Sequence, residues 1–243
     1  MRVWITGASS GIGAATAREL ARRGHTLFLT ARSADRLAEH PGEAKRGDVT
    51  DRGSMHRIAG EIAPLDLALL NAGTYVPVEP RHFDADVFRE HLEVNAMGTV
   101  HCLEAVLPAM LELRHGRIAV VASVTGYAAL PRAAAYGATK AFLISMCESL
   151  RADLAGTGVE LTLINPGFVR TPLTAQNEFG MPFLIEPEQA ARVIADGLEA
   201  GRPEISFPLP MALAMKTLGA LPGAVSRRYT ARLARRLRER GRA

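Results

Sequence analysis

The segment TGASSGIG, residues 6–13, constrains the fold of this chain more than any other stretch. It follows the aliphatic run RVWIT (2–6), which predicts a buried strand, and it opens a segment with helical period. We interpret Gly7 as permitting a tight turn, Gly11 as letting the backbone approach a ligand, and Gly13 as allowing close packing of helix on strand. Backbone N–H groups at such a helix start attract an anion, so the loop predicts an anion-binding turn.

Short aliphatic runs alternate with longer segments of helical period up to about residue 207. Further strands are predicted at 25–30, 43–47, 65–71, 116–123, 158–167 and 204–207. Helices are predicted at 11–24, 33–39, 51–62, 84–113 with an interruption near Pro108, 134–156 and 187–200. This alternation is typical of an α/β fold whose parallel sheet is covered on both faces. One domain is expected over 1–207, with a helical extension over 208–243.

The glycine loop lies in the context that a dinucleotide site requires, with a strand before it, a helix after it and further strands at βαβ spacing. A glycine turn without a ligand is the alternative. The segment LFLTARS then places Ala31 and Arg32 about 20 residues beyond the loop, where an NAD site usually carries an acidic residue. Arg32 and Ser33 instead suit a 2′-phosphate, so NADP(H) is expected in preference to NAD(H). The alternative is a surface arginine after a strand.

The stretch AAYGATKA (134–141) carries a phenol and an ammonium four positions apart on a predicted helix. This spacing places Tyr136 and Lys140 on one face, roughly 6 Å apart along the axis. A free tyrosine has a pKa of ~10, and a nearby ammonium is expected to lower that pKa and make the phenol usable for proton transfer. Alone, such a pair is more often a surface pair, but its place behind a dinucleotide loop favours catalysis.

Taken in order, these motifs resemble the short-chain dehydrogenase/reductase family, in its single-domain branch. The resemblance runs from residue 2 to about 207 and rests on TGASSGIG (6–13), Asp48-Val49, NAG (71–73), Asn95 in EVNAMG, Ser123 in VVASVTG, YGATK (136–140) and NPGFVRT (165–171). Leu70 stands where the family often has a further Asn, which puts little of the function in doubt. The resemblance implies a Rossmann-type doubly wound sheet of about seven strands in the order 3-2-1-4-5-6-7.

The resemblance also implies four catalytic residues. Tyr136 would be the general acid/base, and Lys140 would support it and hold the nicotinamide ribose. Ser123, at a strand end, would orient the substrate oxygen, and Asn95 would hold a water that links Lys140 to solvent. Taken alone, Ser123 is a strand-end serine, and Asn95 could be a buried helix residue bonded to nearby backbone.

The expected cofactor site is larger. Asp48 would contact the adenine amino group, Asn71 would pass along the adenosine ribose, and Thr171 would bond the carboxamide or the pyrophosphate. The full expected set is Gly7, Ser9, Ser10, Gly11, Ile12, Gly13, Ala31, Arg32, Ser33, Asp48, Val49, Asn71, Ala72, Gly73, Tyr136, Lys140, Pro166, Gly167, Val169 and Thr171.

The substrate side is expected to come from 124–132, from Met97 and from 171–187. Its apolar side chains predict a hydrophobic alcohol or ketone, and they are Tyr127, Leu130, Leu173, Phe179, Met181 and Phe183. Arg132 and Arg170 are candidates for holding an anionic group. The alternative is that several of these residues only pack the loop against the body.

The charge of the chain is concentrated at its end. Formal net charge is +4, but 226–243 holds eight arginines against Glu239 and carries +7, which leaves −3 elsewhere. The basic balance is therefore no sign of a nucleic-acid-binding domain. Tyr229, Leu233 and Leu237 recur at every fourth position, which predicts a basic amphipathic helix. Its role stays open between a partner subunit, weak contact of 208–243 with an anionic membrane surface, and a solubilising frayed end.

Other sequence features bear on metal binding, membrane insertion and location. Cys102 and Cys147 form no CxxC motif, and the seven histidines lack metal-ligand spacing, so no metal site is expected. Prolines and Lys216 interrupt the apolar run 205–225, which argues against a spanning helix. That run could instead cover the substrate pocket or touch lipid. With no signal peptide in view, a cytoplasmic location is expected.

Together these features predict an NADP(H)-dependent oxidoreductase, a carbonyl reductase that interconverts a ketone or aldehyde and an alcohol. Relatives usually pair through the helices at 84–113 and 134–156, so a homodimer or homotetramer is expected. Two alternatives stay open: a non-catalytic protein that senses a dinucleotide, and a redox enzyme acting on a lipid at a membrane surface.

Overall fold

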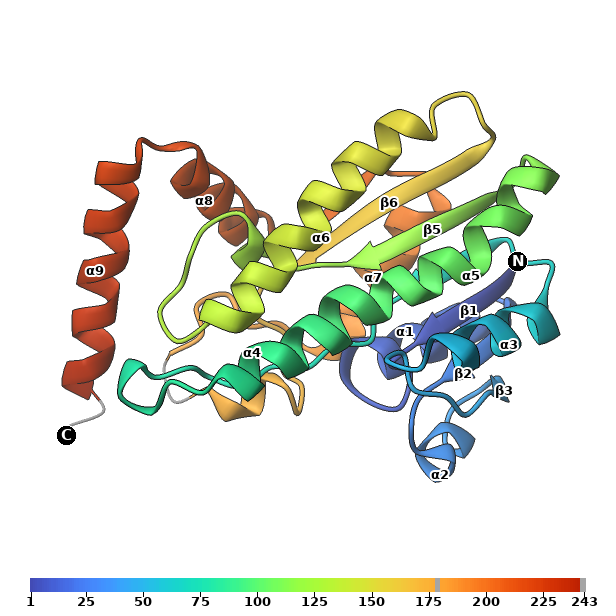
Figure 1. The fold of residues 1–243 in the computed structure, drawn as a ribbon, viewed down its shortest axis with the longest axis horizontal. Helices are drawn as coiled ribbons and strands as arrows, with labels where there is room; N and C mark the ends of the chain where they lie inside the picture. The colour runs from blue at the N-terminus through green and yellow to red at the C-terminus, as the bar shows by residue number, and fades with distance from the viewer. Residues whose placement is uncertain (178–179, 241–243) are drawn as a thin grey trace.

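A computed structural model describes residues 1–177 and 180–240, apart from the side chains of 233, 234 and 236–240. Its centre is a parallel sheet of seven strands in the order β3-β2-β1-β4-β5-β6-β7 (Figure 1). The strands are β1 (Arg2–Thr6), β2 (Thr26–Thr30), β3 (Glu43–Ala44), β4 (Leu67–Leu70), β5 (Gly116–Val121), β6 (Val159–Pro166) and β7 (Glu204–Phe207). The predicted fold class and strand order are confirmed.

Helices cover both faces of this sheet. The long helices are α1 (Gly11–Arg22), α3 (Arg52–Ile62), α5 (Gly98–Leu113), α6 (Ala134–Asp153), α7 (Pro187–Glu199), α8 (Leu209–Ala220) and α9 (Gly223–Arg240). The shorter ones are α2 (Ala34–Ala38), α4 (Ala85–His91), the π-helical η2 (Leu92–Met97), and the 3₁₀ turns η1 (Pro80–His82), η3 (Val124–Gly126) and η4 (Thr174–Gln176). One start predicted from sequence is visible in detail, because the Asp51 carboxylate caps α3 by accepting from the Ser54 N–H at 3.1 Å.

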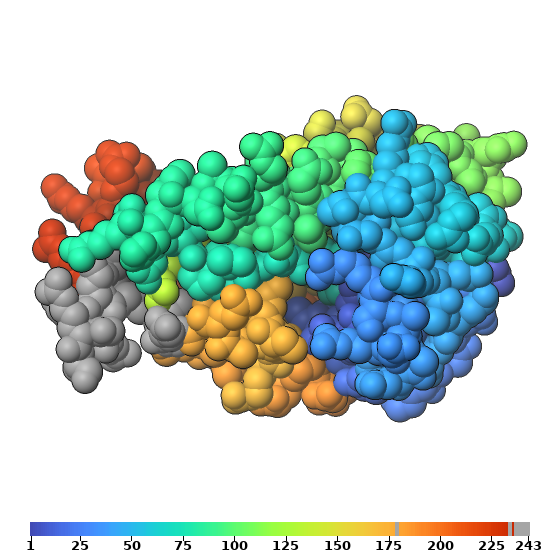
Figure 2. Space-filling view, turned by 60° about the horizontal axis from the view of Figure 1, so that its bottom comes forward, coloured from blue at the N-terminus to red at the C-terminus, as the bar shows by residue number. Residues whose placement is uncertain are grey.

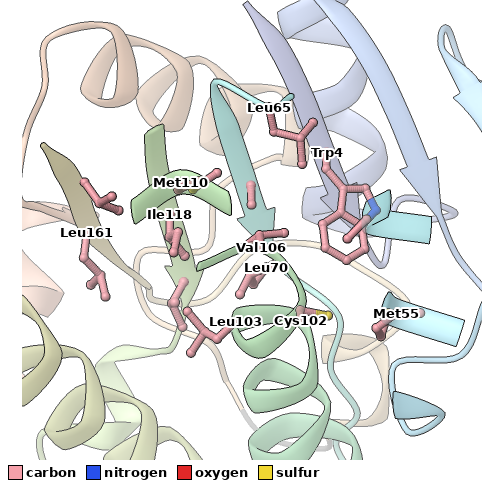
Figure 3. Packing of buried hydrophobic residues seen from close by; sticks show 14 of the residues in the cluster. Trp4, Met55, Leu65, Leu70, Cys102, Leu103, Val106, Met110, Ile118 and Leu161 are labelled. Carbon is pink, nitrogen blue, oxygen red and sulfur yellow. The ribbon is translucent and has the colours of Figure 1, made fainter. Parts of the chain in front are cut away.

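The inner strands, β1, β2, β4, β5 and β6, carry mostly buried apolar side chains on both faces, which is why their sequences read as nearly continuous apolar runs. On one face, Trp4, Leu70 and Ile118 pack against α3, α5 and α6, as Figure 3 shows for part of this core. On the other face, Ile5 and Leu69 pack against α1 and α7. The buried indole of Trp4 is satisfied, because its N–H donates to Thr30 Oγ1 at 2.9 Å.

The segment 84–113 differs from the prediction. Its interruption lies at the π-helical turn η2 around Asn95, and Pro108 sits inside α5 without ending it. Pro108 is on the exposed side of α5, where water can bond the carbonyl left unpaired by the missing N–H. Within the described residues, Ala85–Leu113 is one helical run long and apolar enough to cross a membrane. It places Cys102 and Val106 in the core, as a core helix does.

The two carboxy-terminal helices follow the last strand. The inner face of α8 packs Met211, Ala212 and Met215 against Val124. Helix α9 stands at one end of the molecule (Figure 1), and its Tyr229 side chain is exposed. The helical extension that the sequence predicts therefore contains α8 and α9. The side chains of Leu233 and Leu237 lie outside the described part of the structure.

Candidate active site

The glycine loop has the geometry that its sequence demands. Gly7 and Gly11 have φ of +66° and +56°, a region that side chains with a Cβ rarely adopt. A Cβ on Gly13 would come within 2.3 Å of the Gly7 carbonyl oxygen. The Asn71 amide holds the loop by donating to the carbonyl oxygens of Thr6 and Gly7 at 3.1 and 3.2 Å. The Ser10 side chain makes no capping bond to α1, and Ser10, Gly11 and Ile12 line the cleft, so this helix start can bind an anion there.

A cleft at the carboxyl ends of the strands gathers the predicted cofactor residues. Its lining includes all of them except Gly13, which packs below the loop. Figure 2 shows this cleft as a hollow between the blue amino-terminal segments and the orange segment after β6. A glycine cradle, an open helix start and a strand-end cleft together fit the diphosphate and two nucleosides of a dinucleotide.

Three arginines surround the end of β2. Arg32 and Arg36 line the cleft, and the Arg46 guanidinium donates to the Arg32 carbonyl oxygen at 3.2 Å. The Ser33 hydroxyl accepts from the Arg36 N–H at 3.5 Å and so starts α2 beside the cleft. Sequence reasoning found Arg32 and Ser33 but missed Arg36 and Arg46. Arg36 lies four residues after Arg32, on the short helix α2 that begins beside the cleft, and this spacing was the available signal for Arg36.

Ser123 and Tyr136 meet at the inner end of the cleft. The Ser123 hydroxyl donates to the Pro166 carbonyl oxygen at 3.3 Å and accepts from the Thr125 N–H at 3.2 Å. Burial raises the pKa of Tyr136 to about 12, although its hydrogen bond with Ser123 opposes that rise. Between neutral pH and about 10 the phenol therefore remains protonated and can donate.

Lys140 is buried behind Tyr136. Its Nζ donates to the Val121 carbonyl oxygen at 2.8 Å and lies 5.4 Å from the centroid of the Tyr136 ring. Burial lowers the pKa of Lys140 to about 8. Burial is the largest influence on the Tyr136 pKa and raises it, so the net shift is opposite to the lowering that the sequence predicts.

Replacing Lys140 with Met is expected to change how stability depends on pH. The folded-state pKa of about 8 lies below the ordinary 10.5, so the unfolded chain binds more protons between these values. The free energy of unfolding of the wild type should therefore gain up to about 3 kcal/mol relative to the variant as pH rises through that window. Urea unfolding of both proteins at each end of the window measures this. Parallel pH profiles would show that the Lys140 pKa is not lowered.

Asn95 is held by the protein rather than open to the cleft. Its amide oxygen accepts from the Thr74 N–H at 2.7 Å, and its amide nitrogen donates to the Thr74 carbonyl at 3.0 Å and to Thr139 Oγ1 at 3.1 Å. This is the backbone-bonded arrangement that stood as the alternative for Asn95. The hydrogen bonds of its side chain go to Thr74 and Thr139, and that of Lys140 goes to Val121. The water relay assigned to Asn95 remains a prediction.

A small hollow lies beside Tyr136, where the sequence places the substrate, and its described lining carries no charged side chain. Leu130 and Leu173 line it, as predicted, together with Tyr75 and Phe168, which sequence reasoning missed, and Met211, which lies in the run 205–225 that could cover the pocket. Met211 comes from α8, so the run 205–225 covers this hollow, one of the two roles left open for it. Nothing local in the sequence brings α8 to this site, because the contact is made by the tertiary fold.

Several residues expected on the substrate side lie elsewhere. The Tyr127 hydroxyl instead donates to Glu204 at 2.9 Å, and Met97 and Phe183 are exposed. Met181 is absent from the described lining, and Phe179 lies outside the described residues. The two arginines proposed for an anionic group pair with glutamates instead, Arg132 with Glu79 and Arg170 with Glu186, each at 2.8 Å.

The segment that carries Tyr75 is fixed on both sides. The Gln176 amide donates to the Tyr75 carbonyl oxygen at 3.1 Å, and the Val76 N–H donates to Nε2 of buried His91 at 3.1 Å. The Tyr75 ring meets the Tyr136 ring edge-on, with centroids 5.3 Å apart. A second phenol is thus held rigidly beside the first.

Comparison with known proteins agrees with this site. The family model described as short chain dehydrogenase matches residues 1–180. An uncharacterized oxidoreductase of Myxococcus xanthus is 38% identical, over 90% of this chain and 91% of that relative. The cis-4-hydroxycyclohexanecarboxylate dehydrogenase of Sinomonas cyclohexanicum is 34% identical, over 77% of this chain and 79% of its own.

Solved structures give the same answer. A short-chain dehydrogenase from Burkholderia cenocepacia in complex with NADP superimposes with a TM-score of 0.83 at 28% identity, covering 93% of this chain and 96% of its own. The strand order, the glycine loop, the tyrosine and lysine of α6 and the family match all agree. The chain therefore belongs to the short-chain dehydrogenase family of oxidoreductases, whose members bind a nicotinamide dinucleotide.

Proposed function

We propose that this protein is an NADP(H)-dependent oxidoreductase that interconverts an apolar ketone or aldehyde and its alcohol. One observation carries the proposal. Ser123 and Tyr136 belong both to the lining of the cofactor cleft and to that of the uncharged hollow beside it. A substrate oxygen placed at that junction would lie within reach of both hydroxyls and of the cofactor.

Different residues of the cleft suit different groups of the cofactor. The glycine loop and the start of α1 would hold the diphosphate, and Arg32 with Arg36 would hold a 2′-phosphate through charge-assisted hydrogen bonds. Neither Ala31 nor Arg32 offers the carboxylate that a ribose 2′-OH prefers. The NADP-bound relative from Burkholderia supports the same choice. When bound, the nicotinamide ring supplies or accepts the hydride.

The protein's own part is to manage one proton. With its pKa raised to about 12, Tyr136 holds that proton at neutral pH and can give it to an oxygen that becomes an alcohol. Ser123 would donate to the same oxygen and fix its direction. Buried Lys140 places a positive charge behind the phenol, which favours the phenolate left after the proton has gone. Alcohol oxidation needs that phenolate first, so its rate should rise with pH.

The substrate class follows from the hollow. Its described lining is mostly apolar, with Leu130, Phe168, Leu173 and Met211 on it and no charged side chain. The relative from Sinomonas acts on a hydroxylated cyclohexane ring that bears a carboxylate. We propose a cyclic or branched secondary alcohol or ketone here, without the carboxylate, because the described lining has no cation to pair with it.

Changing Met211 to Trp is expected to raise KM for a bulky ketone about tenfold while leaving KM for the cofactor unchanged, because the larger ring fills the hollow. Leu213→Trp is the matched control, since Leu213 lies on the same helix but is 55% exposed. Steady-state kinetics of both variants with small and bulky ketones measure the effect. Equal changes in KM for the bulky ketone in the two variants would show that Met211 does not line the substrate pocket.

The proposed function is tested with a panel of apolar and carboxylated ketones and alcohols, supplied with each of the two nicotinamide cofactors. Consumption of NADPH with the apolar ketones is the expected result. Tight NADPH binding without turnover on any member of the panel would instead favour a non-catalytic sensor. Activity confined to charged metabolites would contradict the substrate class.

The proposed pairing of subunits is separate from the chemistry. Helices α5 and α6 expose Leu113 and Phe142, at 56% and 43%, which supports a self-association face on these helices. Light scattering of the wild type and of Phe142→Ser would test this face by measuring the molar mass of the assembly in solution.

A further inference from the structure

The outer face of α8 is mostly apolar. Leu209 and Leu213 are 64% and 55% exposed, and Leu221, just after the helix, is 39% exposed. Lys216 is the one charged residue between 209 and 226, and its Nζ is paired with the Glu204 carboxylate at 2.6 Å. Exposed leucines on a helix whose one lysine is paired are typical of a site of interaction with something apolar.

Helix α9, which follows α8 in the chain, carries a dense positive charge. Arg227, Arg228, Arg232 and Arg235 are exposed on it, and so are the apolar Val225 and Tyr229. The whole segment 226–243 carries eight arginines against one glutamate. Both views place α9 and the segment leading into α4, which bears Phe83 at 66% exposure, at the same end of the molecule (Figures 1 and 2).

Charge decides between the possible occupants of this surface. A second copy that docked through the same face across a two-fold axis would bring two arginine-rich helices together, and their repulsion opposes such a dimer. An anionic lipid surface instead offers phosphate groups to the arginines and a hydrocarbon boundary to the leucines. We propose that the outer face of α8 and the arginines of α9 dock this protein on an anionic lipid surface.

The docked arrangement also orients the molecule. Helix α8 presents Leu209 and Leu213 outward, and the same helix presents Met211 inward to the hollow beside Tyr136. Docking through α8 therefore sets one wall of that hollow next to the lipid surface. The lipid contact itself does not depend on the proposed reaction, and it is measured without turnover.

Co-sedimentation of the full chain with vesicles tests the docking. Vesicles of phosphatidylglycerol and phosphatidylcholine in equal parts are compared with phosphatidylcholine alone, at about 20 mM and about 500 mM salt, because salt screens surface charge. Binding to the anionic vesicles at low salt and release at high salt is the expected result. Absence of binding at low salt, or equal binding to both vesicle types, would overturn the proposal.

Substitutions on α8 and α9 test which residues make the contact with the lipid surface. The triple change Arg227→Gln, Arg228→Gln and Arg232→Gln should weaken partitioning about 100-fold, at about 1 kcal/mol for each arginine near the surface. Leu213→Ser should weaken it about tenfold through lost apolar burial.

The matched control is Arg22→Gln, Arg57→Gln and Arg202→Gln, which removes the same charge from exposed arginines elsewhere on the molecule. It should keep nearly all of the binding, and near-ultraviolet circular dichroism checks that every variant is folded. Equal loss in the control would mean that net charge, not α8 and α9, drives binding. If Leu213→Ser splits a dimer and leaves vesicle binding unchanged, the face belongs to a second copy and the proposal fails.

Discussion

Replacing Tyr136 with Phe should lower kcat about 1,000-fold, within the range that a general acid supplies, and leave NADPH affinity within about twofold. The change removes one hydroxyl and keeps the ring that packs edge-on against Tyr75. Because the pKa of Tyr136 is raised to about 12, the wild-type phenol is fully protonated at neutral pH, so the loss should be the same from about pH 6 to about pH 8. Single-turnover kinetics and NADPH fluorescence titration measure the two effects.

Tyr75→Phe is the matched control for this change. It removes the same atom from the neighbouring phenol, whose ring centroid is 5.3 Å from that of Tyr136. We expect a loss in kcat below about tenfold, since Tyr75 lines the hollow without belonging to the cofactor cleft. Equal losses in the two variants, or a Tyr136→Phe enzyme that keeps a tenth or more of its activity, would contradict the assignment of the proton donor.

The second large effect is expected at Arg32. Arg32→Asp should lower the ratio of kcat/KM for NADPH over NADH at least about 100-fold, because it removes charge-assisted bonds of about 1.5–3 kcal/mol and adds a repelling carboxylate. The new carboxylate also suits a ribose 2′-OH, so activity with NADH should hold or rise. Arg36→Gln should give a smaller shift in the same direction, since Arg36 also lines the cleft.

Arg57→Asp controls for the change in net charge. Arg57 is exposed on α3, is paired with Glu61 at 2.9 Å, and is not part of the cleft. The ratio of kcat/KM for NADPH over NADH should stay within about twofold of wild type in this variant, because salt screens charges that lie far from the cleft. A ratio that barely moves in Arg32→Asp would show that Arg32 does not hold the 2′-phosphate.

The parts of this molecule that sequence predicts well are those set by local patterns. The continuous apolar strands allow few alternatives to a parallel sheet, and positive φ at Gly7 and Gly11 is available almost only to glycine. The Asp51 cap and the position of Arg32, two residues after the end of β2, likewise follow from a few residues of chain. These local patterns are sufficient to predict that the cofactor residues gather in one cleft.

The parts that sequence missed or left open depend on contacts between distant segments. Tyr127 faces Glu204 because β7 lies beside β6, and Met211 reaches the hollow because α8 packs on η3. The π-helical turn at Asn95 is stabilised by bonds to Thr74, which no local period encodes. The pKa of Tyr136 likewise follows from burial, and burial is a property of the whole fold.

The proposed reaction is the transfer of a hydride between NADP(H) and a carbonyl carbon. It is tested most directly with NADPH carrying deuterium at both C4 positions of the nicotinamide, together with the apolar ketone that is consumed fastest. Mass spectrometry of the product should find deuterium on the carbinol carbon of the alcohol, and Tyr136→Phe should form almost none of that product. An alcohol without deuterium, or no alcohol with any ketone in the panel, would contradict the account.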